Sequence, residues 1–401
     1  MEIDIGRGKK GRRAYGFDDI AIVPSRRTRD PDDIDISWTL GPYRFELPLV
    51  ASAMDGVVSP DTAVLVNELG GLGVLNLEGI WTRFENAEEH LEKIAAAPKH
   101  TATRLMQEIY AEPVKPELIG KRVAEIKERG AVACGSLTPQ KVREHYEIAV
   151  EAGLDILVIQ GTVISAEHVS TTVEPLNLKE FIAEVPVPTV VGGCASYSTG
   201  LHLMRTGAVG VLVGVGPGAA CTTRGVLGIG VPQATAIADV AAARSQHMLE
   251  TGEYVNVIAD GGMRTGGDVS KAIACGADSV MVGSPLARAK EAPGRGFHWG
   301  MATFHPSLPR GTRVSTKQDG TMEEILLGPA QENDGTFNLM GALKTSMATC
   351  GYEDIRSFQR AEVMVAPALM SEGKQLQKEQ SVGMGSNGRA AVATGVAVSD
   401  D

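Results

Sequence analysis

The sequence predicts an α/β protein built as a single-domain (β/α)8 TIM barrel. Eight short apolar runs, each ending in glycine or polar residues, alternate with helical stretches. The runs are apolar throughout rather than alternating, which indicates strands covered on both faces and hence a parallel sheet. Eight βα units in about 250 residues are typical of this barrel. A doubly wound open sheet is the alternative, and it is disfavoured because no dinucleotide fingerprint follows the first strand.

The eight apolar runs are the predicted strands. They cover residues 47–54, 72–77, 131–136, 156–161, 188–193, 210–216, 255–262 and 279–284. Helical segments lie between the strands. The clearest are residues 60–69, 139–152, 199–206, 233–249 and 267–275.

The segments around the repeating units have weaker patterns. Residues 1–16 are polar and contain glycine, so we expect an N-terminal arm before a barrel domain at 17–375. Three prolines punctuate residues 97–130, which we interpret as a short connection with one helix at 117–129.

The C-terminal third is less regular. Residues 285–345 are rich in Gly, Pro and His and predict long functional loops over the barrel mouth, including a shortened flap within 297–335. Order returns at 351–370. The last stretch, 376–401, predicts a flexible tail.

Composition excludes several classes of protein. The chain of 401 residues is 43% hydrophobic, enough for a sizeable core, and its net charge of −11 disfavours nucleic-acid binding. No apolar run is long enough for a membrane span, and none follows the basic N-terminal residues as in a signal peptide. Five cysteines without CxxC spacing indicate neither a disulfide framework nor a zinc site, which fits a cytoplasmic protein.

A glycine-rich loop after the sixth strand holds the first candidate for chemistry. The strand runs into Gly214, Gly216 and Gly218, which tolerate backbone angles that other residues resist, and Cys221 follows at the far end. A thiol there is well placed to attack a ligand, and Arg224 or loop N–H groups could stabilise its thiolate. The alternative is that Cys221 is a small buried hydrophobe.

Polar and flexible residues also follow three other strands. Glycine-rich turns after the seventh and eighth strands of such barrels often hold a phosphate, although tight turns need glycine in any case. Asp260 could accept hydrogen bonds from a ribose diol, or it could cap the next helix. The candidates are Ser52, Met54 and Asp55, then Asp260, Gly261, Gly262 and Arg264, then Gly283 and Ser284.

These motifs resemble the inosine monophosphate dehydrogenase and GMP reductase family, and they stand in the family's order over roughly residues 14–375. The Cys221 loop, Gly-Val-Gly-Pro-Gly-Ala-Ala-Cys-Thr-Thr-Arg, carries the closest match. The other motifs are Phe17-Asp18-Asp19 with Val23-Pro24, Ser52-Ala53-Met54-Asp55, Gly70-Gly71-Leu72-Gly73, Gly192-Gly193, Ala259-Asp260-Gly261-Gly262-Met263-Arg264, Met281-Val282-Gly283-Ser284 and Gly300-Met301.

The resemblance implies a TIM-barrel enzyme, a homotetramer or an octamer, that acts on a purine 5′-monophosphate with NAD in guanine nucleotide biosynthesis. Cys221 would attack purine C2, with Thr223 beside the reacting carbon, and water would release xanthosine monophosphate. The implied substrate-binding residues are Ser52, Met54, Gly218, Asp260, Gly261, Gly262, Gly283, Ser284, His298, Gly300 and Met301, and the implied cofactor-binding residues are Gln160, Gly214 and Gly216.

The sequence departs from the family pattern in several places. Residues 97–130 are too short for the usual pair of cystathionine-β-synthase domains. Ala219 stands where relatives commonly have a phosphate-binding serine. Cys194 stands where they have asparagine, and Gln160 where an aspartate contacts the nicotinamide.

The shortened flap leaves the water-activating residue undecided. Arg310 occupies the position expected to hold glutamate or glutamine, which argues against a reductase. We assign the catalytic role to Arg310 by position, with Arg313, His298 and His305 as rivals. His298 also stands in place of a phosphate-contacting tyrosine.

Relatives often place potassium against carbonyls of the catalytic loop, here Gly216, Gly218 and Cys221, and a neighbouring subunit's C-terminal segment, here 372–374, completes the site. No other metal is expected. The ammonium of Lys374 could replace that ion, or it could be an ordinary solvated lysine. Two other functions are retained as alternatives: a GMP reductase that uses NADPH, and a non-catalytic regulator that binds purine nucleotides.

Overall fold

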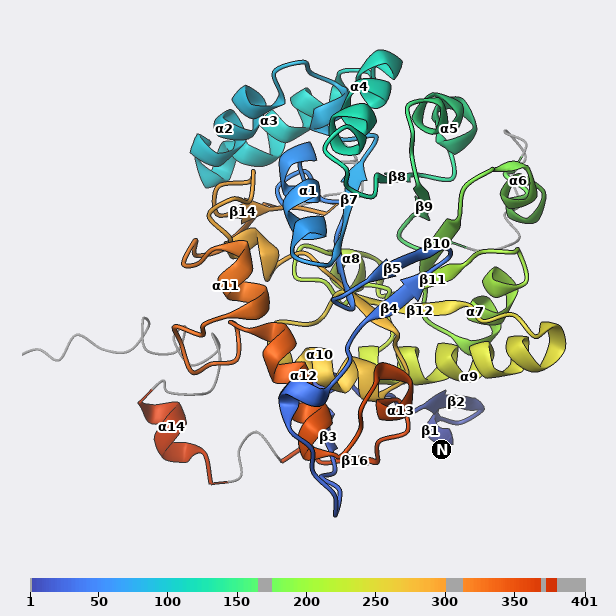
Figure 1. The fold of residues 1–401 in the computed structure, drawn as a ribbon, viewed down its shortest axis with the longest axis vertical. Helices are drawn as coiled ribbons and strands as arrows, with labels where there is room; N and C mark the ends of the chain where they lie inside the picture. Colours follow the sequence, from blue (N-terminus) through green and yellow to red (C-terminus); the bar gives the residue numbers. More distant parts are fainter. Residues whose placement is uncertain (1, 165–174, 301–312, 369–372, 381–401) are drawn as a thin grey trace, which may run out of the picture.

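Eight parallel strands close into a barrel in the computed structural model, which describes residues 2–164, 175–300, 313–368 and 373–380 (Figure 1). Each strand overlaps one of the eight predicted runs, so the predicted TIM barrel is confirmed. The strands are β6 (Leu49–Ala51), β7 (Leu72–Asn76), β8 (Cys134–Leu137), β9 (Ile156–Gln160), β10 (Thr189–Cys194), β11 (Gly210–Val213), β12 (Asn256–Asp260) and β13 (Ser279–Val282).

The strands lack polar alternation because both of their faces are covered. One face fills the barrel, where Val50, Val158, Leu212 and Ile258 belong to one buried cluster. The other face packs with the surrounding helices in a second, larger cluster. Successive side chains on a strand point to opposite faces, so a strand in this position needs apolar residues throughout.

A small hairpin covers the middle of the barrel at one end (Figure 1). It consists of β4 (Trp38–Leu40) and β5 (Tyr43–Phe45), and Trp38, Leu40 and Phe45 join the cluster inside the barrel. The Trp38 indole donates to the carbonyl of Leu47, just before β6, at 2.8 Å. The hairpin therefore lies at the amino ends of the strands and leaves the carboxyl ends for chemistry.

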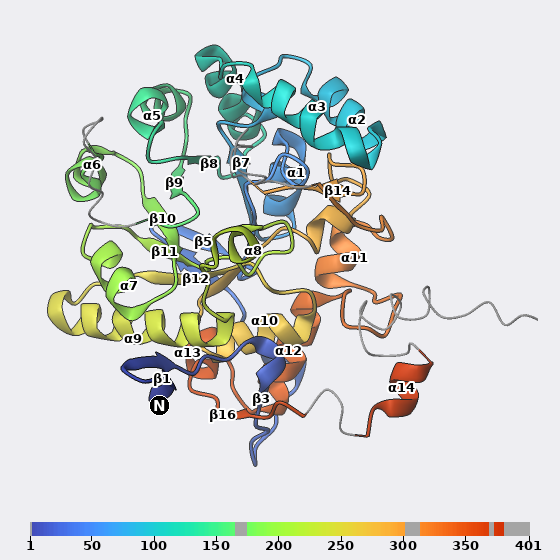
Figure 2. The same cartoon turned by 180° about the vertical axis from the view of Figure 1, so that it is seen from behind.

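Helices surround the barrel in chain order, and α8 lies over its middle when it is seen from behind (Figure 2). All five clearest predicted helices are present, as is the one expected at 117–129. The helices are α1 (Pro60–Glu68), α2 (Ala87–Ala96), α3 (Lys99–Ala111), α4 (Pro116–Lys127), α5 (Val142–Glu151), α6 (Leu178–Glu184), α7 (Tyr197–Met204), α8 (Thr223–Leu227), α9 (Gln233–Thr251), α10 (Gly266–Ala274), α11 (Met322–Leu327), α12 (Leu339–Thr349), α13 (Ile355–Phe358) and α14 (Gln375–Glu379).

Two segments are more ordered than predicted. The connection at 97–130 contains α3 in addition to α4, and α3 buries Ala102, Met106 and Ile109 along one face. The expectation of loops throughout 285–345 is wrong, since α11 and most of α12 lie there. Helices α11 and α12 pack against each other, and α12 also packs against α10, which the local sequence pattern does not reveal.

The ends of the described chain form small elements. The expected arm contains a hairpin of β1 (Glu2–Gly6) and β2 (Lys9–Arg12), and the first residues of the expected tail form α14. Two further pairs of short strands lie outside the barrel. They are β3 (Ile20–Ile22) with β16 (Val363–Val365), and β14 (Phe297–His298) with β15 (Val314–Ser315).

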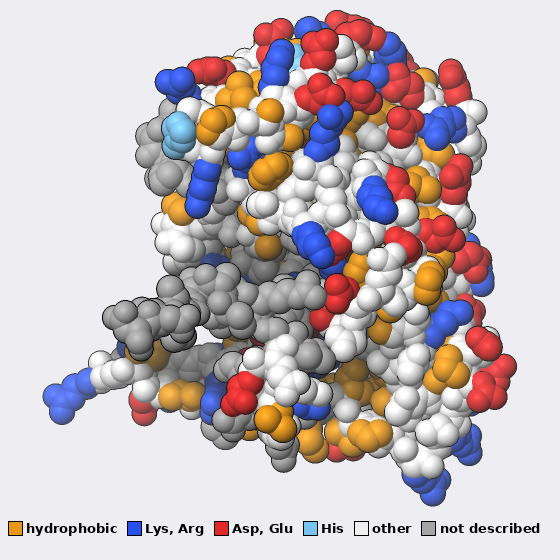
Figure 3. Space-filling model, turned by 90° about the vertical axis from the view of Figure 1, so that its left-hand side faces the viewer, with side chains coloured by type: hydrophobic (Ala, Val, Ile, Leu, Met, Phe, Trp, Pro, Cys, Tyr) orange, Lys and Arg blue, Asp and Glu red, His pale blue; other side chains and the backbone are white. Residues whose placement is uncertain are grey.

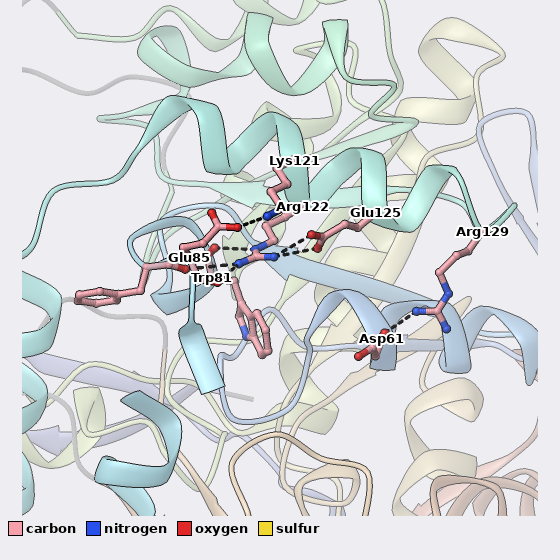
Figure 4. A network of polar contacts seen from close by, with 8 residues as sticks. Asp61, Trp81, Glu85, Lys121, Arg122, Glu125 and Arg129 are labelled. Atoms are coloured by element: carbon pink, nitrogen blue, oxygen red, sulfur yellow. Dashed lines mark hydrogen bonds and ion pairs between the residues drawn. The ribbon is translucent and has the colours of Figure 1, made fainter. Parts of the chain in front are cut away.

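Arg122 fixes α4 to the turn that follows β7 (Figure 4). This arginine is 7% exposed, and its guanidinium donates to the carbonyls of Trp81 at 3.0 Å and Glu85 at 2.7 Å, and to the Glu125 carboxylate at 2.8 Å. The contacts hold the short 3-10 helix η3 (Ile80–Thr82) from outside. The first residue of η3 contacts Asp55, beside the candidate site.

The surface carries both signs of charge. Figure 3 shows acidic and basic side chains interspersed over one face of the molecule. Several form ion pairs between neighbouring elements, such as Arg129 with Asp61 at 2.5 Å. In the part of the chain that the structure describes, no helix is both long enough and apolar enough to cross a bilayer.

Candidate active site

A cavity of about 900 Å³ opens at the carboxyl ends of the barrel strands. Loops far apart in the sequence line it. Of the further candidates in the described ranges, Arg264 lines it and Asp55, Arg313 and Lys374 do not, whereas it gathers all fifteen described residues to which the family resemblance assigns a role in catalysis, substrate binding or cofactor binding. These are Ser52, Met54, Gln160, Gly214, Gly216, Gly218, Cys221, Thr223, Asp260, Gly261, Gly262, Gly283, Ser284, His298 and Gly300. Met301, Arg310 and His305 lie outside the described residues.

Cys221 is exposed on the cavity wall, whereas Cys134, Cys194 and Cys350 are buried and Cys275 is partly buried. The alternative of a buried hydrophobe is therefore wrong for this thiol. Its Sγ donates to Oγ1 of Thr223 at 3.2 Å.

The loop geometry explains the glycines before Cys221. Its amide donates to the Gly218 carbonyl at 3.0 Å, which closes a tight turn. Gly216 has a φ of 79°, which favours glycine, and a Cβ there would lie 2.6 Å from Cγ of Arg224. The Arg224 guanidinium donates to the carbonyl of Val231 at 2.7 Å, so it braces the loop from behind.

Asp260 lies partly buried at the end of β12, where its Oδ2 accepts a hydrogen bond from Nε2 of Gln160 at 3.1 Å. Burial raises the pKa of Asp260 to about 7, against the opposing effect of the Gln160 donor. The alternative role as a helix cap is wrong, because Thr265 caps α10 and Asp268 completes its capping box. The carboxylate is free of that task and faces the cavity.

The turns after β11 and β12 meet directly. Nε2 of Gln233 donates to the carbonyls of Val213 at 2.6 Å and Asp260 at 3.1 Å, and so joins the two strand ends. A Cβ on Gly261 would lie only 3.1 Å from the Gly218 amide nitrogen. Small residues at both turns are required for this close approach.

Ser284 and His298 form a pair at another part of the cavity. Oγ of Ser284 lies 2.8 Å from Nε2 of His298, which is 1% exposed. Burial lowers the pKa of His298 to about 4, so the imidazole is neutral at pH 7. Its Nδ1 is buried without a hydrogen-bond partner among the described residues.

Met54 packs over the turn that follows β13. A Cβ on Gly283 would lie 2.5 Å from the Met54 sulfur, so a larger residue there would displace the end of the Met54 side chain.

Arg313 is unsuited to activate water. Its Nη2 donates to the carbonyl of Ala97 at 2.8 Å, and its Nη1 to that of Ile94, at the end of α2. A guanidinium that donates to carbonyls offers no lone pair for a proton.

The cation contacts that the resemblance implies stay a prediction, because Lys374 was expected to reach the loop from a neighbouring subunit. Lys374 is exposed and is not among the residues that line the cavity. In the described ranges, no group of three or more His, Cys, Asp or Glu side chains could hold a metal ion.

Several residues of the cavity wall escaped the sequence analysis. Thr138, Pro139 and Gln140 follow β8, and Thr162 and Val163 follow β9. Their position just after predicted strands was the available signal, but none carries a group with distinctive chemistry. They extend the cavity beyond Gln160.

The family model described as "IMP dehydrogenase / GMP reductase domain" matches residues 14–375. The chain belongs to this family. The match covers the barrel and every lining residue of the candidate site. Both activities in the family's name are oxidoreductase activities.

Individual relatives place the chain within the family. It is 48% identical over 372 residues to an uncharacterized oxidoreductase of Mycolicibacterium smegmatis, which covers 90% of this chain and 99% of that one. An inosine-5′-monophosphate dehydrogenase of Cryptosporidium parvum is 30% identical, over 84% of this chain and 88% of that one. A crystal structure of an IMP dehydrogenase/GMP reductase-like protein from Corynebacterium glutamicum has a TM-score of 0.86 and 46% identity, over 91% of this chain and 97% of that one.

Proposed function

We propose that this protein oxidises inosine 5′-monophosphate to xanthosine 5′-monophosphate with NAD. The observation that carries the proposal is an exposed thiol, Cys221, on a glycine-rich loop in the same cavity as the Asp260 carboxylate and the glycine turn that carries Ser284. A nucleotide monophosphate satisfies all three features at once. Family membership supports the purine.

Cys221 is the proposed nucleophile. Its sulfur would form a bond to purine C2, the hydride would pass from C2 to NAD, and water would then displace the sulfur, so that C2 gains an oxygen and one proton is released. Thr223 is 2% exposed, and its hydroxyl contacts the sulfur at 3.2 Å, which fixes the direction of the thiol.

Two groups would hold the rest of the nucleotide. The Asp260 carboxylate can accept hydrogen bonds from both ribose hydroxyls, and Gln160 orients it. Ser284, the neighbouring glycine turns and the His298 imidazole would contact the phosphate. Gln160 was expected at the cofactor, but the bond to Asp260 supports a role at the ribose.

The cavity has room for a second ligand. Its volume of about 900 Å³ lies near the upper end of the roughly 300–1,000 Å³ usual for small-molecule sites. A dinucleotide would supply hydride acceptance, and the walls formed by Gly214, Gly216 and residues 138–140 and 160–163 are open to it. We keep NAD as the proposed cofactor, and Arg310 or His305 as the proposed water activator.

A spectrophotometric assay tests the proposal with two mixtures. Inosine monophosphate with NAD should produce NADH, and GMP with NADPH should leave the absorbance at the reduced-cofactor band unchanged. Consumption of NADPH in the second mixture would establish a reductase instead. If both mixtures stay unchanged while inosine monophosphate binds, the proposal is wrong and nucleotide sensing replaces it.

A further inference from the structure

A chain of three buried or partly buried side chains lies directly behind the nucleotide site. Asp55 follows Met54 and is 1% exposed. Its Oδ2 accepts hydrogen bonds from the Ile80 amide at 3.0 Å and from the Tyr110 hydroxyl. The same hydroxyl accepts a hydrogen bond from the indole nitrogen of Trp299 at 2.7 Å.

Trp299 stands between two residues of the cavity wall. His298 and Gly300 both line the cavity, whereas Trp299 does not and is 1% exposed. The indole therefore anchors the segment on the side away from the ligand. Oγ of Ser284 holds His298 on the ligand side, at 2.8 Å.

Tyr110 comes from α3, and α3 is itself held firmly. Nε of Arg83 donates to the Glu78 carbonyl at 3.1 Å, and its Nη1 donates to the carbonyl of Glu112, which ends α3. The Arg83 guanidinium also lies 5.7 Å from the centre of the Tyr110 ring. The tyrosine is thus a rigid support.

A second contact braces the same segment from the neighbouring helix. The Arg313 guanidinium, bound to carbonyls at the end of α2, lies 4.0 Å from the centre of the Phe297 ring. Phe297 immediately precedes His298. Helix α3 therefore contacts the 297–299 segment directly through Tyr110, and the end of α2 supports it indirectly through Arg313.

We propose that Tyr110 is a positioning residue of the nucleotide site, which acts through Trp299 to fix His298 and Gly300 on the cavity wall. The inference rests on the proposed function only for the identity of the ligand. The proposal assigns α3 an indirect role in the site, because this helix carries no residue that lines the cavity. The hydroxyl is essential because it accepts from Trp299 and donates to Asp55 at the same time.

The electrostatics of the chain agree with this direction of the hydrogen bonds. Burial raises the pKa of Asp55 to about 6, while the hydrogen bond from Tyr110 lowers it. Burial and the neighbouring carboxylate raise the pKa of the Tyr110 phenol well above its usual value. At pH 7.5 the phenol is protonated and Asp55 is ionised, which is the state that the hydrogen bonds require.

The test compares Tyr110→Phe with Tyr43→Phe. Tyr43 is a matched control because its hydroxyl also donates to a carboxylate, that of Asp155 at 2.9 Å, but at the amino end of the barrel. Amide hydrogen exchange is measured without ligand on peptides that cover residues 294–300, and KM and kcat are measured with inosine monophosphate and NAD.

Tyr110→Phe should speed exchange in the 294–300 peptide and raise the KM for the nucleotide about tenfold, because a hydrogen bond to a charged buried group is lost. We expect kcat to stay within about twofold, since Cys221 is untouched. Trp299→Phe should have the same effects, and the double variant no larger ones, because both substitutions break one chain. Tyr43→Phe should leave that peptide and the KM unchanged.

Unchanged exchange at 294–300 in Tyr110→Phe would overturn the inference. Faster exchange spread equally over all peptides would also overturn it, because Tyr110 would then be a general structural residue. If the wild type neither binds nor turns over inosine monophosphate, the proposed function fails, and the exchange measurement still decides the role of Tyr110.

Discussion

The environment of the Asp260 carboxylate bears directly on the ribose contact proposed for it. Burial disfavours its charged form. A hydrogen bond from Nε2 of Gln160 stabilises the ionised carboxylate and offsets part of this effect. Hydroxyls of a ribose would add two more donors to the ionised carboxylate. Ligand binding and ionisation of Asp260 should therefore be coupled near neutral pH.

This coupling predicts a pH dependence of nucleotide affinity. With a pKa of about 7, Asp260 is protonated in the free protein below pH 7 and loses an acceptor that the ribose requires. The Kd for inosine monophosphate should rise as the pH falls through 7, by about tenfold per unit once the carboxyl is protonated. Isothermal titration calorimetry at a series of pH values from about 5.5 to about 8.5 measures this dependence on both sides of the pKa of Asp260.

Asp260→Asn serves as the control for that series. The nucleotide's own phosphate titrates near pH 6, and this contribution should persist in the variant. The variant should bind more weakly at pH 8 and lose the steeper limb near pH 7. A wild-type Kd that is constant from about pH 6 to about pH 8, roughly one unit on either side of the pKa of Asp260, would contradict the role assigned to this residue.

At the scale of elements, the barrel separates stability from chemistry. The β4–β5 hairpin fills the amino end with Trp38, Leu40 and Phe45, while the loops after β11, β12 and β13 form the site at the other end. Substitutions at the two ends should therefore have different consequences.

Trp38→Ala tests this separation. Trp38 is 5% exposed inside the core, so its loss should lower the free energy of unfolding by about 3–5 kcal/mol through the cavity that it leaves. The KM for inosine monophosphate should stay close to that of the wild type. Urea denaturation and steady-state kinetics measure the two effects, with Trp38→Phe as the milder comparison. A large change in KM in folded Trp38→Ala protein would show that the two ends are coupled.

The elements that sequence analysis predicts are those whose pattern is local. Strands buried on both faces are apolar without interruption, so all eight were found. Helix α3 is mostly polar, has three buried apolar residues and is flanked by prolines. Its local sequence pattern therefore predicts a connecting segment rather than a helix. Helix α12 lies in a segment rich in glycine, and its packing against α10 is a long-range fact.

The same limit applies to the site. Strand ends and glycine turns predicted most of the residues that meet in the cavity, because the carboxyl ends of parallel strands converge, and the family resemblance added Gln160, Thr223, His298 and Gly300. The contact of Tyr110 with Trp299 joins residues 189 positions apart and has no signature in either segment. Arg313 is an example of the reverse: its place near the flap made it a rival to Arg310 for the catalytic role, but its guanidinium donates to carbonyls at the end of α2.

On the scale of the whole molecule, one barrel holds a thiol, a carboxylate and several glycine-rich turns around a single cavity. Only Cys221, of the five cysteines, is exposed there. Under the proposed function, the other lining residues would orient a nucleotide so that this sulfur meets its reactive carbon.

Mass spectrometry of the Cys221 peptide, after acid quench of protein turning over inosine monophosphate and NAD, tests covalent catalysis most directly. We predict an oxidised purine nucleotide attached to Cys221 in the wild type, and neither adduct nor turnover in Cys221→Ala, which should still bind the nucleotide. Steady turnover by Cys221→Ala, or an adduct on another cysteine, would contradict the assignment of Cys221 as the nucleophile.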